Sequence, residues 1–121
     1  MKRIATVLVV LALAGCGIFE MDITSKKLEI IAPVDGAVVP VGEVEFAWRQ
    51  MEYADGYLLR VVSPSFDRAE RIVKDTVIVT DSLSGDMVCG FVLDTGDYEW
   101  SVASFNTAYG SEGEILRLQV R

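Results

Sequence analysis

The amino-acid sequence predicts an all-β fold, a seven-stranded antiparallel β-sandwich, for most of the chain. Apolar and polar residues alternate with a period of two in several short segments, which is typical of half-buried strands. Gly, Pro, Asp and Ser separate these segments at close intervals, as turn residues do. No segment of the sequence shows the 3.6-residue period of an amphipathic helix, so helices are not expected.

Seven segments fit the strand pattern. The clearest is 43–49, where Val44, Phe46 and Trp48 fall on one face and charged residues on the other. The segment 71–80 holds two β-branched runs, so it is predicted as one strand with an irregularity, and the alternative of two strands stays open. In chain order the predicted strands are 28–32, 43–49, 57–62, 71–80, 87–93, 98–103 and 115–120.

The first 15 residues have the features of a signal peptide. Lys2 and Arg3 precede an uncharged apolar run at 4–14. Eleven residues in a helix span only about 16 Å, about half of the hydrocarbon core of a bilayer. The run is therefore too short to be a transmembrane anchor, and the first boundary is placed after residue 15.

The motif Leu13-Ala14-Gly15-Cys16 resembles the lipobox of bacterial lipoprotein precursors. The resemblance implies that the Cys16 thiol receives a diacylglycerol, that a peptidase cleaves between Gly15 and Cys16, and that the new amine is acylated. Two or more acyl chains hold a protein on a membrane stably. The alternative is an ordinary secretory signal with a free Cys16. Because residue 17 is Gly, the resemblance to enterobacterial lipoproteins favours the outer membrane.

The predicted mature chain is strongly acidic. The whole chain has 11 Lys and Arg against 18 Asp and Glu. Because Lys2 and Arg3 lie in the cleaved segment, 9 basic residues remain against 18 acidic ones, a net charge of −9. Such a chain is repelled by phosphate backbones and anionic headgroups, so nucleic acid is excluded as a partner.

The composition also argues against an enzyme. The sequence contains no His, which removes Ser-His-Asp and Cys-His nucleophile activation and the commonest transition-metal ligand. Glu43 and Glu45 share one strand face, where they are interpreted as solubilising charges. Oxygen-rich turns can hold Ca²⁺, but Asp is also a favoured turn residue, so no metal or cofactor is expected. The Asp residues in predicted turns are Asp81, Asp86, Asp94 and Asp97.

The predicted organisation has three parts: a lipoprotein signal peptide (1–15), the lipidated cysteine with a tether (16–27), and the sandwich (28–121). As a flexible coil, a tether of about ten residues spans roughly 15 to 20 Å on average. Lipid on Cys16 leaves Cys89 without a partner in the chain, so a disulfide framework is excluded. Cys89 lies in a strand-like run, and free Cys is usually buried, so it is predicted to be core or half-buried.

Three motifs of the sandwich resemble those of fibronectin type III domains, and together they cover about 28–121. The resemblance implies an immunoglobulin-like sandwich with core aromatic residues in its second and third strands. The motifs are Val44-x-Phe46-x-Trp48 after a turn at Pro33, Ala54-Asp55-Gly56-Tyr57 at the third strand, and Leu93-x-x-Gly96-x-Tyr98-x-Trp100-x-Val102, followed by Asn106 and Gly110.

The last motif implies a tyrosine corner. Gly96 is expected to permit the tight turn between strands of opposite sheets. Tyr98 then lies in the core, and its hydroxyl reaches a backbone group near Leu93 or Asp94. This is a structural role and not a binding site.

Aromatic residues in predicted loops are the candidate binding residues. Tyr53, Phe66 and Tyr109 can stack on sugars or anchor a protein contact, although single exposed aromatic residues often have no function. Four further aromatic residues fall on the apolar, inward face of their predicted strands and are assigned to core packing: Trp48, Tyr57, Tyr98 and Trp100.

Strand parity predicts which loops share an end of the sandwich. If 71–80 is one strand, the tether and the loops 51–55 and 105–113 lie at one end, facing the membrane. The loops 33–42, 63–69 and 94–97 then face outward. This makes Phe66 the more accessible candidate.

These observations favour a non-catalytic binding or scaffolding lipoprotein that presents a single sandwich at the bacterial cell envelope. The alternative is a carbohydrate-binding accessory lipoprotein of a polysaccharide-handling system. The membrane is a partner through Cys16 in both cases. The further partner, protein or glycan, stays open at this point.

Overall fold

The computed structural model describes residues 22–79 and 85–121. The predicted signal peptide, the lipobox residues 13–16 and Asp81 lie outside the described residues. Within those two ranges the chain forms eight strands and no helix. None of the described residues belongs to a helix long and apolar enough to cross a membrane.

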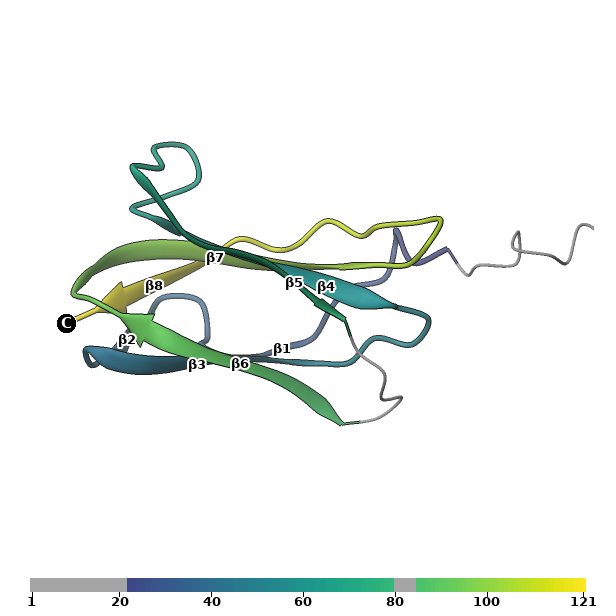
Figure 1. The fold of residues 1–121 in the computed structure, drawn as a ribbon, viewed down its shortest axis with the longest axis horizontal. Helices are drawn as coiled ribbons and strands as arrows, with labels where there is room; N and C mark the ends of the chain where they lie inside the picture. Colours follow the sequence, from purple (N-terminus) through teal and green to yellow (C-terminus); the bar gives the residue numbers. More distant parts are fainter. Residues whose placement is uncertain (1–21, 80–84) are drawn as a thin grey trace, which may run out of the picture.

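Two sheets pack face to face as a sandwich (Figure 1). The smaller sheet has the order β1 (Ile30–Ala32), β3 (Gly42–Arg49), β6 (Asp86–Leu93). The larger sheet has the order β2 (Ala37–Val39), β8 (Leu116–Val120), β7 (Gly96–Phe105), β4 (Gly56–Ser63), β5 (Arg71–Val79). The predicted all-β sandwich is confirmed.

Strand β2 was not predicted, and it makes the sandwich not wholly antiparallel. It pairs in parallel with β8, with Ala37 opposite Leu118 and Val39 opposite Val120. Three residues between prolines are too few to show an alternation, so the sequence pattern favoured a loop. The strand forms because β8 offers a free edge, and the Arg121 N–H also donates to the Val39 carbonyl oxygen (3.0 Å).

The segment 71–80 is predicted as one strand, with two strands as the alternative. The structure contains one strand there, β5. Its irregularity is real: Lys74 lies opposite Val61 and Ile72 opposite Val62, so Val73 is an extra residue in the pairing. Such a bulge bends and twists a strand without ending it. The two β-branched runs therefore belong to one edge strand.

The core lies between the sheets and contains the aromatic residues that were assigned to packing. Trp48, Tyr57, Tyr98 and Trp100 are each at most 2% exposed. Trp100 packs edge-on against Phe46 (ring centroids 4.9 Å apart), and Trp48 packs in the same way against Tyr57 (5.6 Å). Such edge-to-face pairs stabilise a core beyond the burial of their area.

The corner between β6 and β7 is closed by Tyr98, whose hydroxyl donates to the Asp94 carbonyl oxygen (2.6 Å). We expected Gly96 to permit the tight turn at this corner, but the structure shows no need for a glycine there. Its φ is not positive, and an added Cβ would meet the Tyr98 ring at an ordinary 3.6 Å. Cys89, on β6, is half-buried, and it is a free thiol.

Candidate functional site

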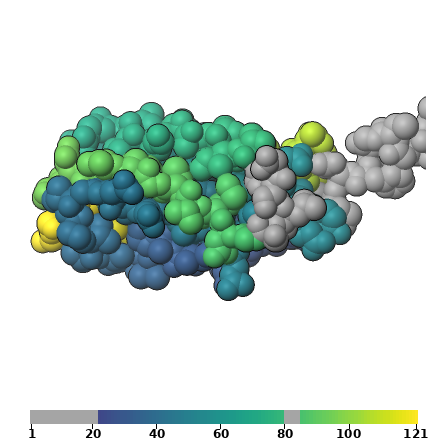
Figure 2. Space-filling model, turned by 60° about the horizontal axis from the view of Figure 1, so that its bottom comes forward, coloured from purple at the N-terminus to yellow at the C-terminus, as the bar shows by residue number. Residues whose placement is uncertain are grey.

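The loops divide between two ends of the sandwich. We call the end formed by 22–27, the β3–β4 loop (50–55) and the β7–β8 loop (106–115) the proximal pole. The distal pole holds 33–41, 64–70, 94–95 and the C-terminal residue. Figures 1 and 2 show the 50–55 and 106–110 loops together at one end and the C-terminus at the other. This grouping agrees with strand parity. The unpredicted strand β2 runs in the same direction as β1, so it adds no chain reversal and leaves the loops at their predicted ends.

Tyr53 is the exposed tip of the β3–β4 loop. It is 48% exposed and adopts a φ of 70°, a left-handed conformation that non-glycine residues rarely adopt. The Lys26 ammonium lies 4.9 Å from the centroid of its ring, a cation–π contact. The segment before β1 and the β3–β4 loop therefore meet at this side chain.

Asn106 joins the two tyrosine-bearing loops of the proximal pole. Its Nδ2 donates to the Tyr53 carbonyl oxygen (3.1 Å), which holds the β3–β4 loop. Its Oδ1 accepts from the backbone N–H groups of Ala108 (3.0 Å) and Tyr109 (2.8 Å) within its own loop. Asn106 is only 7% exposed, so these bonds are shielded from water. Tyr53 and Tyr109, both predicted candidates, are thereby brought to one surface.

A second polar cluster lies beneath these loops. The Ser104 and Ser111 hydroxyls are hydrogen-bonded to each other, and the Ser104 hydroxyl also donates to the Met51 sulfur (3.2 Å). The Met51 N–H donates to the Tyr57 hydroxyl oxygen (2.8 Å). Burial raises the pKa of Tyr57 above its ordinary value, so the hydroxyl stays protonated. The buried polar residues of the described chain are Ser104, Asn106 and Ser111, all at the proximal pole.

Sequence reasoning missed these polar residues. Ser and Asn are common in turns, so Ser111 gave no signal beyond loop formation, and Asn106 entered only as a residue that follows the fibronectin-like motif, without a role. Their burial follows from loops that are distant in sequence. The available signal was the presence of Ser104 at an inward position of a strand whose other inward residues are apolar or aromatic.

The end of the predicted tether is packed onto the domain. Ile23 is fully buried, and its carbonyl oxygen accepts from the Lys26 N–H (3.0 Å). The Asp22 carboxylate accepts from the Thr24 hydroxyl (2.6 Å) and N–H (2.9 Å). These two bonds hold the pKa of Asp22 below its ordinary value. An apolar residue in a mixed segment gave no period, so the packing was not visible in the sequence.

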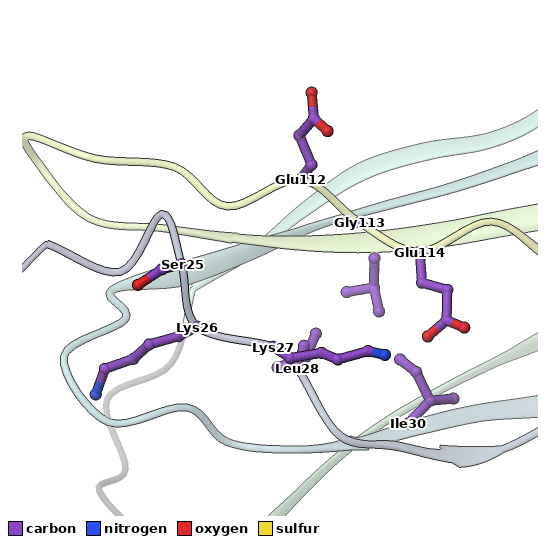
Figure 3. A pocket seen from close by; sticks show the side chains of 9 residues that line it. Ser25, Lys26, Lys27, Leu28, Ile30, Glu112, Gly113 and Glu114 are labelled. Atoms are coloured by element: carbon purple, nitrogen blue, oxygen red, sulfur yellow. The ribbon is translucent and has the colours of Figure 1, made fainter.

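A groove of about 350 Å³ begins beside this segment and lies between 25–30 and 112–114 (Figure 3). Leu28, Ile30 and Val102 supply its apolar lining. The Lys27 and Glu114 side chains extend into it, whereas Lys26 points away (Figure 3). The groove offers both signs of charge beside an apolar floor.

Phe66 is not part of this surface. It lies in the β4–β5 loop at the distal pole, and its backbone N–H donates to the Glu99 carboxylate (2.8 Å). Its side chain is half-buried, whereas Tyr53 is exposed. Strand parity placed Phe66 at the outward end, and it does lie at the distal pole, but its side chain is less exposed than that of Tyr53.

The distal pole carries an apolar groove of about 430 Å³ between the β1–β2 connection and β3. Pro33, Val34 and Pro40 line it, with Glu43 and Glu45 at its side. Three valines of this region are largely exposed: Val34 (64%), Val38 (60%) and Val41 (52%).

An exposed ion pair joins the β1–β2 connection to β8. The Asp35 carboxylate accepts from the Arg117 N–H (2.8 Å) and contacts its guanidinium (3.4 Å). The hydrogen bond from the Arg117 backbone N–H is the main cause that holds the pKa of Asp35 below its ordinary value. The bond from the Arg117 side chain is the second cause. Asp86, Asp94 and Asp97 do not gather: within 22–79 and 85–121, no three acidic or cysteine side chains lie close enough to hold a metal ion.

No protein-family model and no curated protein matches the chain. Ten solved chains have a similar structure. The fn3 domain of the human collagen alpha-1(XX) chain is 26% identical, with a TM-score of 0.51 over 79% of this chain and 88% of that domain. The sulfur carrier protein SoxY from Chlorobium limicola f thiosulfatophilum is 10% identical, with a TM-score of 0.47 over 93% and 96%. The chain thus has a fibronectin type III-like β-sandwich, a fold that suggests a binding or scaffolding module.

Proposed function

We propose that this protein is a bacterial lipoprotein that presents one non-catalytic binding or scaffolding sandwich at the cell envelope, with the outer membrane favoured. The observation that carries the proposal is the lipobox-like motif ending at Cys16, directly before a single fibronectin type III-like domain. Lipid on Cys16 anchors the chain, and the domain supplies the surface.

The different features of the two poles support an anchor at one end and a binding surface at the other. The described chain begins at the proximal pole, where Ile23 is buried, so the anchor is attached at that end. The distal pole offers the exposed Val34 and Val38 and an apolar groove flanked by Glu43 and Glu45. Exposed apolar patches with a polar rim mark protein interaction sites, so the partner of this pole is a protein.

Lipid labelling tests the anchor. Cells that express the full chain are fed an alkyne-tagged fatty acid, and label and membrane association are measured. Wild-type protein is expected to carry label, and Cys16→Ser is expected to lose both label and membrane association. Cys89→Ser is the matched control, because it removes the other thiol and should keep the label. Full membrane retention of Cys16→Ser would contradict the proposal.

A carbohydrate-binding accessory role is the second candidate. The specific observation in its favour is that Tyr53 and Tyr109, both exposed, are joined at one pole by Asn106. Aromatic rings on one surface can stack on sugar rings. Glycan-array binding by Tyr53→Ala and Tyr109→Ala, with Phe66→Ala as the control at the other pole, tests it. Glycan binding that is lost only in the first two variants supports this role, and binding unchanged in all three removes it.

A further inference from the structure

We propose that the proximal pole rests on the zwitterionic headgroup layer of the membrane to which Cys16 is attached, with Tyr53, Tyr109 and Lys26 as the contacting side chains. The inference rests on the proposed lipid anchor and adds to it a docking surface and an orientation. Under it the loops at the proximal pole contact lipid, and the distal pole is the end that a partner reaches.

The first argument is the length of chain before the packed residues. Ile23 is already buried against the domain, and Asp22 lies next to it in a turn that local hydrogen bonds close. Only residues 16–21 separate them from the lipidated cysteine, and six residues span at most about 20 Å. Strand β7 runs between the poles over ten residues, about 33 Å. The anchor can therefore hold the proximal pole at the membrane, but it cannot reach the distal pole.

The second argument is the chemistry of the exposed side chains. Tyr is enriched where membranes meet water, because its ring is apolar and its hydroxyl is wet. Tyr53 (48% exposed) and Tyr109 (37% exposed) both lie at this pole. Lys26 is stacked on the Tyr53 ring, and its aliphatic stem can lie along the interface with the ammonium among phosphate groups.

The third argument is that these side chains are held in place before any contact forms. Tyr53 keeps its left-handed backbone because Asn106 binds its carbonyl oxygen (3.1 Å), and Asn106 also fixes the Tyr109 N–H (2.8 Å). A strained backbone that its surroundings enforce often marks a functional surface. Because the loops are already ordered, docking loses little further conformational entropy.

The charge at this pole selects the kind of lipid. The segments that form this pole contain Lys26 and Lys27 together with Asp22, Glu52 and Glu112, so both signs are present with an acidic excess. An anionic surface would repel that excess, whereas zwitterionic headgroups offer a partner to each sign. The docking surface therefore fits phosphatidylethanolamine or phosphatidylcholine and not phosphatidylglycerol.

The test measures how close each pole comes to the headgroups. The lipidated chain, carrying Cys89→Ser, receives a fluorophore at Thr107→Cys (proximal) or at Thr95→Cys (distal); both threonines are exposed. Each form is placed in phosphatidylcholine vesicles that contain a headgroup nitroxide lipid. Quenching is expected at 107 and not at 95, because the distal pole is about 33 Å farther from the bilayer. Equal quenching at both positions overturns the inference.

Three further arms separate the causes. The double variant Tyr53→Ser, Tyr109→Ser should lose the quenching at 107, whereas Phe66→Ser should keep it; retention in the double variant removes the tyrosines from the inference. Added phosphatidylglycerol should weaken the quenching at low salt, and stronger quenching would overturn the choice of lipid. Flotation is recorded throughout. Failure to float with vesicles contradicts the anchor itself, whereas flotation with equal quenching contradicts only the docking.

Discussion

The proximal and distal poles close the same two sheets with different chemistry. At the proximal pole the loops are joined by shielded bonds from Asn106 and by the Ser104–Ser111 pair. The contacts at the distal pole include the exposed Asp35–Arg117 pair and the Tyr98 hydroxyl bond, and several valines face water. A buried polar network fixes one loop conformation, because each unsatisfied member would be costly. An exposed ion pair fixes far less.

This difference in loop contacts suggests that the two poles have separate functions. A surface that must always meet the same neighbour benefits from rigid loops, which the proximal pole has. A groove with an apolar lining and exposed valines can adapt to a partner, which the distal pole offers. Three experiments test the contrast, and they are ordered by expected effect.

Asn106→Ala should give the largest loss. It removes the bonds to the Tyr53 carbonyl oxygen and to the Ala108 and Tyr109 N–H groups, which are shielded. We expect the free energy of unfolding to fall by about 2–3 kcal/mol. Denaturant unfolding measures it. Thr107→Ala, an exposed change in the same turn, should stay within about 0.5 kcal/mol. Similar values for the two variants would mean that the network does not hold the pole.

The pair Tyr57→Phe and Tyr98→Phe compares one hydroxyl near each pole. Removing the Tyr57 hydroxyl leaves the Met51 N–H, which is half-buried, without its acceptor. Removing the Tyr98 hydroxyl leaves the Asp94 carbonyl group, which is exposed and can bind water. We expect losses of about 1–2 kcal/mol for Tyr57→Phe and about 1 kcal/mol for Tyr98→Phe by thermal melting. The reverse order would contradict the contrast between the poles.

The smallest effect concerns pH and the distal ion pair. The Arg117 bonds hold the pKa of Asp35 below its ordinary 3.8, so the folded state binds fewer protons there than the unfolded state. The contribution is therefore present above that value and is lost as the pH falls through the folded-state pKa. Asp35→Asn should make Tm fall less steeply at acid pH. Tm measured from about pH 6 to about pH 2 shows this. An unchanged acid slope would indicate that the pair contributes nothing.

Alternation predicted the strands well where each strand has one buried face. Val44, Phe46 and Trp48 gave the phase of β3, and all three lie in the core. The predicted strand 71–80 became β5, including its bulge. Strand β2 escaped because three residues carry no period and their pairing depends on the edge of β8.

The candidate site was predictable only in part. Tyr53 and Tyr109 were recognised as loop aromatics, and Asn106 was noted after the fibronectin-like motif, but its role in joining the two loops leaves no pattern in the sequence. The loop of Phe66 was placed at the correct end, but its backbone bond to Glu99 could not be read from the sequence. Ile23 was assigned to the tether, because one buried residue in a mixed segment leaves no periodic pattern.

The sequence by itself determined the sandwich class, the core aromatic residues, the predicted anchor at Cys16 and the division of the loops between two ends. These properties depend on local periodicity, on short motifs and on strand parity, all of which are written along the chain. Only the tertiary structure decided where the packed domain begins, which loops share hydrogen bonds, and which aromatic residues stay exposed. Those properties depend on contacts such as Asn106 with Tyr53 and Lys26 with Tyr53, whose partners are far apart in sequence and meet only when both sheets have formed.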